Sequence, residues 1–110
     1  MGTNVKKFKT GDPVYAFIPI PNGGGYAEYA LAKENQAALR PATLTFGEAA
    51  GVPSVALAAW QSLVDKANVQ SGQTVLIQGA SGGVGMLPIP IAKVRGATVF
   101  ATASMAIKIF

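Results

Sequence analysis

A run of small residues behind an apolar stretch is the part of this chain best suited to chemistry. Residues 75–85 read VLIQGASGGVG. A glycine-rich turn between a strand and a helix presents unpaired amides at the positive end of the helix dipole, where a pyrophosphate can bind. In the G-x-G-x-x-G fingerprint the three glycines make the tight turn, admit the pyrophosphate and let helix and strand pack closely. Ala80, Gly82 and Gly85 occupy these places, which predicts a dinucleotide-binding turn of A-x-G-x-x-G form. A flexible turn without a ligand is the alternative.

The end of the second strand indicates which dinucleotide such a turn would hold. An acid there accepts hydrogen bonds from a ribose 2′-hydroxyl, whereas an uncharged or basic end tolerates a 2′-phosphate. No acid occurs in residues 97–110, and Lys108 is four residues beyond Ser104. NADP(H) is therefore favoured over NAD. The predicted cofactor-binding residues are Ala80, Ser81, Gly82, Gly83, Val84, Gly85, Ser104 and Lys108. The Ser81 hydroxyl could donate to phosphate, and it fits a small turn residue equally well.

The flanking segments predict a βαβ unit around this turn. TVLIQ (74–78) is a short apolar run typical of a strand buried on both faces. IPIAKVRG (89–96) could be helical with Gly96 as its C-terminal cap, and ATVFATA (97–103) is a second strand. The two strands would be parallel, with a right-handed crossover. Pro88 and Pro90 would each cost about 3 kcal/mol in a helix interior. The helix is therefore predicted to start late, near Pro90, or to be distorted.

The first half of the chain predicts strands and then helices. Strands are expected over 14–20, where Pro19 would confine the strand to an edge or end it, and over 26–32, so that the first forty residues form antiparallel β structure. The spacing of Thr45 and Glu48 is that of a capping box, which predicts a helix from Phe46. Pro53 predicts a break near 51–53 and a second helix over 55–67. The face expected to be buried comprises Val55, Leu57, Ala59, Leu63 and Val64. Trp60 is interpreted as a core residue, with ligand stacking as the alternative.

Composition excludes several classes of site. The 110 residues contain no cysteine or histidine and only five carboxylates, so no metal site is expected, zinc least of all. Part of the net charge of +4 comes from Lys6, Lys7 and Lys9, interpreted as a solvated N-terminus and not as a nucleic-acid site. No apolar run has membrane-spanning length, and the N-terminus is not interpreted as a secretory signal. A cytoplasmic location is expected, which the lack of cysteine fits.

Four sequence blocks together resemble a known family. They are GGYAEYALA (24–32), LTFGEAAGVPSVALAAWQSL (44–63), VQSGQTVLIQGASGGVG (69–85) and AKVRGATVFATAS (92–104). The region from about Val5 to Ser104 resembles the medium-chain dehydrogenase/reductase superfamily, most closely its zinc-free quinone oxidoreductase branch. The resemblance implies an α/β fold: part of a GroES-like β-barrel catalytic domain (1–44), linking helices (45–72), and the first β-α-β unit of a Rossmann NADP-binding domain (73–110).

The same resemblance implies hydride transfer from NADPH to a small molecule, a quinone or an activated alkene. Family members have further segments on both sides of the matched region, so a truncated chain is expected. The alternatives are a non-catalytic fragment that binds a nucleotide or a partner, and a chain that self-associates through exposed strand edges. No catalytic acid or base is identified, since Glu48 is explained as a cap and Asp65 as a solvated helix residue.

Overall fold

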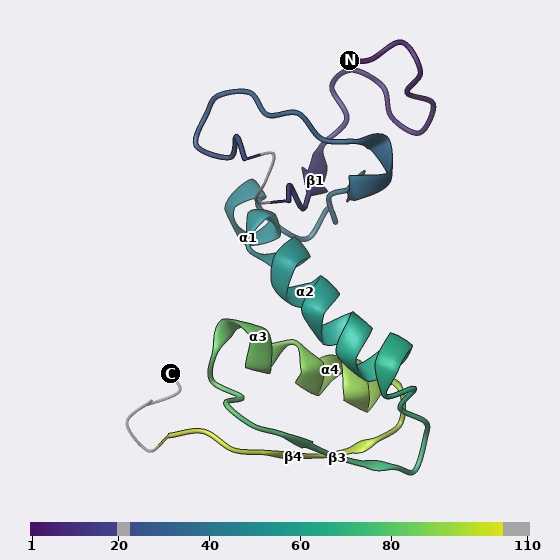
Figure 1. Cartoon of the computed structure of the whole chain (residues 1–110), viewed down its shortest axis with the longest axis vertical. Helices are drawn as coiled ribbons and strands as arrows, with labels where there is room; N and C mark the ends of the chain where they lie inside the picture. Colours follow the sequence, from purple (N-terminus) through teal and green to yellow (C-terminus); the bar gives the residue numbers. More distant parts are fainter. Residues whose placement is uncertain (20–22, 105–110) are drawn as a thin grey trace. The chain divides into compact units, whose positions relative to one another are not determined.

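The computed structural model describes residues 1–19 and 23–104 and shows an α/β protein. The chain divides into two compact units, Met1–Pro53 and Ser54–Phe110 (Figure 1). Within the described ranges, no helix is long and apolar enough to cross a bilayer.

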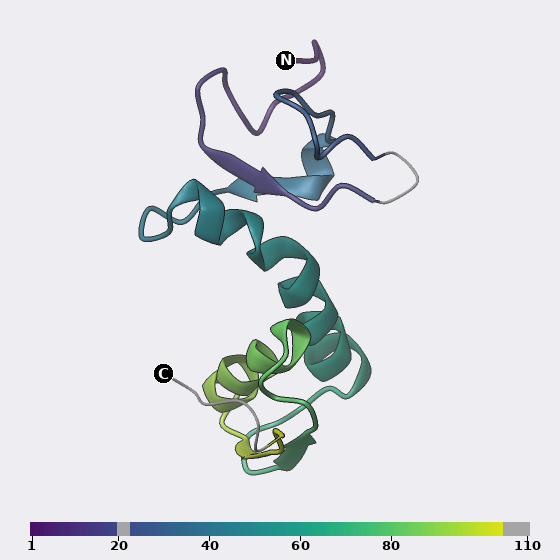
Figure 2. The same ribbon diagram turned by 90° about the vertical axis from the view of Figure 1, so that its left-hand side faces the viewer.

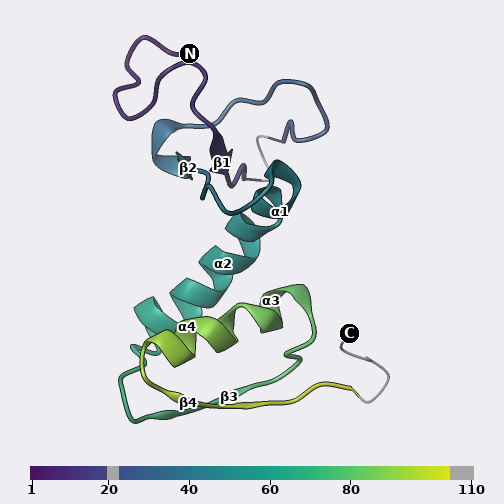
Figure 3. The same cartoon turned by 180° about the vertical axis from the view of Figure 1, so that it is seen from behind.

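The first unit contains a small antiparallel sheet. Its strands are β1 (Val14–Ala16) and β2 (Ala37–Leu39), and they pair with Tyr15 opposite Ala38 (Figure 3). A 3-10 turn, η1 (Glu34–Gln36), leads directly into β2. Of the strand predicted over 14–20, the described residues 14–19 form a strand only at Val14–Ala16, and residue 20 lies outside the described residues.

The strand predicted over 26–32 is wrong. Tyr26, Tyr29 and Leu31 are almost fully exposed, and no described strand pairs with this segment. An alternating pattern produces a stable strand only where a neighbouring strand pairs with its backbone and a core covers one face. The described part of this unit offers neither to residues 26–32.

The capping box is confirmed and begins α1 (Phe46–Ala50). The amide of Glu48 donates to Thr45 Oγ1 at 3.3 Å, and the amide of Thr45 donates to Glu48 Oε2 at 2.8 Å. Gly51 caps the C-terminus, and α2 (Val52–Trp60) follows at once. Because Pro53 is the second residue of α2, its missing amide costs no intrahelical hydrogen bond. The predicted break at 51–53 is thus confirmed.

A parallel βαβ unit forms most of the second unit, as predicted. The strands β3 (Thr74–Ile77) and β4 (Thr98–Ala101) pair in parallel with Leu76 opposite Phe100. Between them the chain forms α3 (Gly83–Met86) and α4 (Pro88–Val94), which lie over one face of the strand pair (Figures 1 and 2). Before β3, the chain leaves α2 through the π-helix η2 (Gln61–Lys66), in which the Ala67 amide donates to Ser62 O at 2.9 Å.

The core of this unit lies between η2, α4 and the covered face of the strands. Leu63, Val69, Ala92 and Ala97 are buried there. The opposite face is open: Leu76 is 60% exposed and Phe100 61%. Burial of the first strand on both faces was therefore a wrong prediction, because helices cover only one side of the described sheet.

The expected buried face of the α2–η2 segment is only partly correct. Ala59 and Leu63 are buried and Val55 and Val64 are half-buried, but Leu57 is exposed. The preferred interpretation of Trp60 as a core residue is also wrong, since half of its surface is exposed.

The helix after the glycines is distorted, as predicted, but it does not start near Pro90. It begins at Gly83, is interrupted at Leu87 and resumes at Pro88. Both prolines then lie in the first turn of α4, where an amide has no intrahelical acceptor.

The C-terminal cap of α4 is confirmed at Gly96. Its φ is +78°, and its amide donates to Lys93 O at 2.9 Å, while the Ala97 amide donates to Ala92 O at 3.0 Å. These two bonds form a Schellman motif, which explains the requirement for glycine.

Candidate functional site

The candidate site is the turn between β3 and α3, at the carboxyl ends of both strands (Figure 1). The Ala80 amide donates to Thr102 O at 2.8 Å, and the Thr102 amide donates to Ile77 O at 2.9 Å. Gly79 has a φ of +66°, a conformation that favours glycine. The turn is thus fixed against the end of β4 by backbone bonds.

Three amides of the turn are available at the start of α3. Gly82 is the N-cap, and its carbonyl accepts the first helical bond, from the Met86 amide at 3.0 Å. The amides of Gly83, Val84 and Gly85 precede that bond, so they have no acceptor within the helix. Such a cluster of N–H groups can donate to an anion.

Gly85 allows the turn backbone to pass against the helix. A Cβ at this position would overlap the Gly79 carbonyl oxygen and lie 2.8 Å from Ala80 Cα. At Gly83, by contrast, the nearest atom would be Val55 Cγ1 at 3.9 Å. The residue in the third place of the fingerprint is therefore the one that the packing requires to be glycine.

A pocket of about 570 Å³ adjoins the turn. It is lined by Ala80, Ser81, Met86, Ile89, Pro90 and residues 101–103. Ser81 is half-buried, and Thr102 supplies a second hydroxyl from the end of β4. Among the described residues, none that lines this pocket is charged, so the lining suits an uncharged ring system better than a metal ion.

The predicted site residues divide into two groups. The structure brings residues 80–85 together in one turn. Ser104 is exposed and is not part of the pocket lining, and Lys108 lies outside the described residues. The pocket residues Met86, Ile89 and Thr102 were not identified from the sequence. The position of Thr102 near the end of the predicted second strand (97–103) was the one available signal.

Two carboxylates have structural roles away from this turn. Hydrogen bonds from the Thr45 amide, the larger cause, and from the Thr45 hydroxyl lower the pKa of Glu48 below its ordinary value. The amides of Lys7 and Lys6 donate to Glu34 Oε1 and lower the pKa of that carboxyl. Within the described residues, no group of three acidic side chains could hold a metal ion.

Comparison with known proteins gives relatives over almost the whole chain, although no family model matches. A quinone-oxidoreductase homologue of chloroplasts in Spinacia oleracea is 43% identical over 106 residues, which cover 92% of this chain and 32% of the relative. A mitochondrial NAD(P)H oxidoreductase of Danio rerio is 39% identical over 107 residues, 94% of this chain and 28% of the relative.

A solved structure shows the same similarity in three dimensions. The crystal structure of an alcohol dehydrogenase superfamily protein from Novosphingobium aromaticivorans has a TM-score of 0.88 at 46% identity, over 93% of this chain and 32% of that one. The chain thus spans about a third of the length of the proteins that it resembles.

Proposed function

Because the chain belongs, over about 93% of its length, to the alcohol dehydrogenase or medium-chain dehydrogenase/reductase superfamily, we propose that it carries part of the site of an NADPH-dependent, zinc-free quinone oxidoreductase. The reaction of such an enzyme is hydride transfer from NADPH to a quinone or an activated alkene, a small-molecule substrate. Relatives named as quinone oxidoreductases or NAD(P)H oxidoreductases support an oxidoreductase with a nicotinamide cofactor.

The close approach of Gly85 to Gly79 is the observation that carries this proposal. It places the free amides of Gly83, Val84 and Gly85 in a turn without obstructing side chains. These amides would donate to the pyrophosphate, and the Ser81 hydroxyl would add a donor. The amides of Ala80 and Gly82 donate within the protein, so these two residues would contribute shape only.

Preference for NADP(H) is supported by the pocket beside the turn. No carboxylate lines it to bind the two ribose hydroxyls, which leaves the 2′ position free to carry a phosphate. Ser104, and Lys108 further along the chain, would be the neighbours of that phosphate. The bound nicotinamide would supply the hydride. This chain would position the dinucleotide and leave the approach to its pyrophosphate free of side chains.

Within this proposal the chain is divided as the resemblance implies. Residues 1–44 would belong to the GroES-like catalytic domain, 45–72 to the linking helices and 73–110 to the Rossmann domain. A chain without cysteine or histidine fits the zinc-free branch, because thiolate and imidazole are the usual zinc ligands. The proposed location is the cytoplasm.

Calorimetric titration with NADPH, NADH and ADP tests the cofactor assignment. We expect NADPH to bind more tightly than NADH. Gly82→Ala should weaken the binding of both nucleotides, because a methyl group at this position would face the pyrophosphate. The Gly47→Ala variant is the control, since Gly47 lies in α1, outside the turn, and a Cβ there would meet no atom within 4 Å. Absence of binding by all three nucleotides would refute the proposal. An assay of NADPH oxidation with a simple quinone then separates an active chain from a non-catalytic nucleotide-binding fragment.

The open face of the strand pair favours self-association as a second candidate. Leu76 and Phe100 lie opposite each other there, and each is more than half exposed. Exposed apolar strands readily pair with other chains. Sedimentation velocity should show oligomers that Leu76→Thr reduces, whereas a monomer at all concentrations would exclude this candidate.

A further inference from the structure

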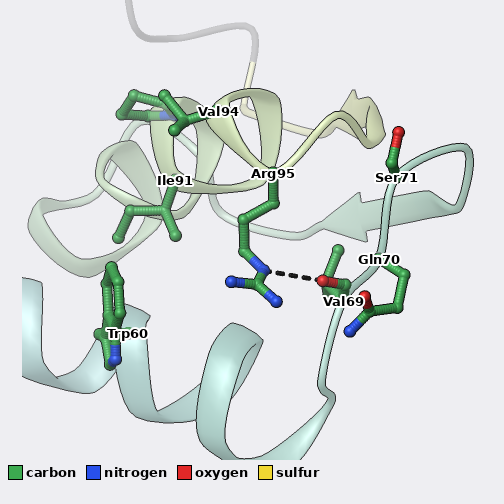
Figure 4. Close-up of a pocket in the computed structure, with 8 residues that line it drawn as sticks. Trp60, Val69, Gln70, Ser71, Ile91, Val94 and Arg95 are labelled. Atoms are coloured by element: carbon green, nitrogen blue, oxygen red, sulfur yellow. Dashed lines mark hydrogen bonds between the residues drawn. The ribbon is translucent and has the colours of Figure 1, made fainter.

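A second pocket of the Ser54–Phe110 unit lies away from the glycine turn, near the C-terminus of α4 (Figure 4). Its volume is about 620 Å³, within the size range of small-molecule sites. An apolar wall is formed by Trp60, Pro90, Ile91 and Val94. Figure 4 shows Trp60 reaching from α2 toward Ile91 on α4.

Arg95 places a positively charged guanidinium of fixed orientation in this pocket. Its side chain extends from the end of α4, and its Nε donates to the Val69 carbonyl at 2.7 Å (Figure 4). That bond leaves the two Nη groups, for which the described residues provide no hydrogen-bond acceptor. The free edge of a guanidinium matches the two oxygens of a carboxylate.

The surroundings leave this charge without a competing acid. No Asp or Glu lines the pocket, and the whole chain carries a net charge of +4. Half of the Trp60 surface and most of Val94, which both line the pocket, are exposed. An aromatic ring is the group that packs best against an indole, while a carboxylate is the group that an oriented arginine binds best.

We propose that this pocket, with Trp60 as the stacking surface and Arg95 as the anion-binding group, binds a small aromatic monocarboxylate. The site is separate from the dinucleotide turn and does not depend on the function proposed for that turn. The apolar wall would bind the ring, and the Nη edge of Arg95 would bind the carboxylate. An uncharged analogue of the same shape would keep only the first of these contacts.

The single tryptophan of the chain provides a direct test. In the ¹⁵N-labelled 110-residue chain, the Trp60 indole N–H gives one isolated NMR signal, and it can be followed during titration with indole-3-acetate and with the neutral indole-3-acetamide. We expect the acetate to shift the signal to saturation and to bind about tenfold more tightly than the amide, the difference made by charge-assisted hydrogen bonds.

Two pairs of variants separate binding from folding. Arg95→Gln should abolish the preference for the acetate, whereas Lys93→Gln, which removes the same charge outside the pocket lining, should preserve it. Because Arg95→Gln also removes the bond to Val69, a second pair uses the exposed rim residue Val94. Val94→Glu should weaken the binding of indole-3-acetate about tenfold by charge repulsion and leave the binding of the amide unchanged. Val94→Gln should alter the binding of neither ligand. Equal affinities for acetate and amide, no shift of the Trp60 signal, or an unchanged preference in the folded Val94→Glu variant would each overturn the proposal.

Discussion

Replacement of Gly85 by alanine should destabilise the βαβ unit, although the change would favour an ordinary helix. The added methyl group would overlap the Gly79 carbonyl oxygen and lie 2.8 Å from two further backbone atoms. A flexible side chain could turn away from such a contact, but these atoms belong to a turn that the Ala80 amide fixes to β4. Overpacking of this kind costs about 1–3 kcal/mol of unfolding free energy.

Gly83→Ala is a matched control in the same four-residue helix. Its methyl group would have its nearest neighbour at 3.9 Å. Alanine also gains up to about 1 kcal/mol over glycine through helix propensity. The two variants contain the same chemical change in the same helix, so the propensity gain cancels, and the expected difference in stability between them, about 1–3 kcal/mol, isolates the contact at Gly85.

Unfolding by urea or heat, followed by Trp60 fluorescence, measures this difference within the unit that contains both glycines. We expect the midpoint temperature of Gly85→Ala to fall by about 4–8 °C for each kcal/mol lost. If Gly85→Ala proves as stable as Gly83→Ala, the close approach of the turn to the helix is absent in solution. The structural argument for the pyrophosphate site would then fail with it.

Substitutions at three further positions test two helix caps and one carboxylate. Thr45→Ala should cost about 1 kcal/mol by removing one half of the capping box, and far-UV circular dichroism should show the loss of helix on mild heating, whereas Thr45→Ser should retain it. Gly96→Ala should destabilise by about 1 kcal/mol or more in urea, since its φ is +78° and its Cβ would lie 2.6 Å from Ser71 Oγ; a wild-type midpoint would contradict this cap. The pKa of Glu34 is lowered from 4.5 by the amides of Lys7 and Lys6, so the folded state binds this proton less readily than the unfolded state. Its contribution to stability is therefore present above pH 4.5 and lost as the pH falls through the lower folded pKa, and acid titration of Glu34→Gln should lack that component.

Local signals in the sequence predicted local structure well. The capping box needs only Thr45 and Glu48, and the Schellman cap needs only a glycine after α4, so both could be identified before any packing was known. The βαβ order was also predictable, because strand, turn and helix signals follow one another within about thirty residues.

Features that depend on distant segments were not predictable. An apolar run such as 74–78 shows that a strand prefers burial, but not whether a second layer covers it, and Leu76 is left exposed. The same limit applies to residues 26–32, which have strand composition and no described partner strand. In the site, glycine spacing indicated the turn, and the prolines predicted a distorted helix. They did not place its interruption at Leu87, so the pocket residues Met86 and Ile89 on either side of it were not identified.

The prolines disturb the proposed anion site less than their positions in the sequence suggest. Both prolines lie in the first turn of α4, where an amide has no acceptor within the helix, so their missing N–H groups cost no hydrogen bond of α4. The positive field at a helix start arises chiefly from the unpaired N–H groups of its first turn. These groups belong to Gly83, Val84 and Gly85, and all precede the interruption at Leu87. The division into α3 and α4 therefore shortens the helix behind the site and leaves the proposed donors in place.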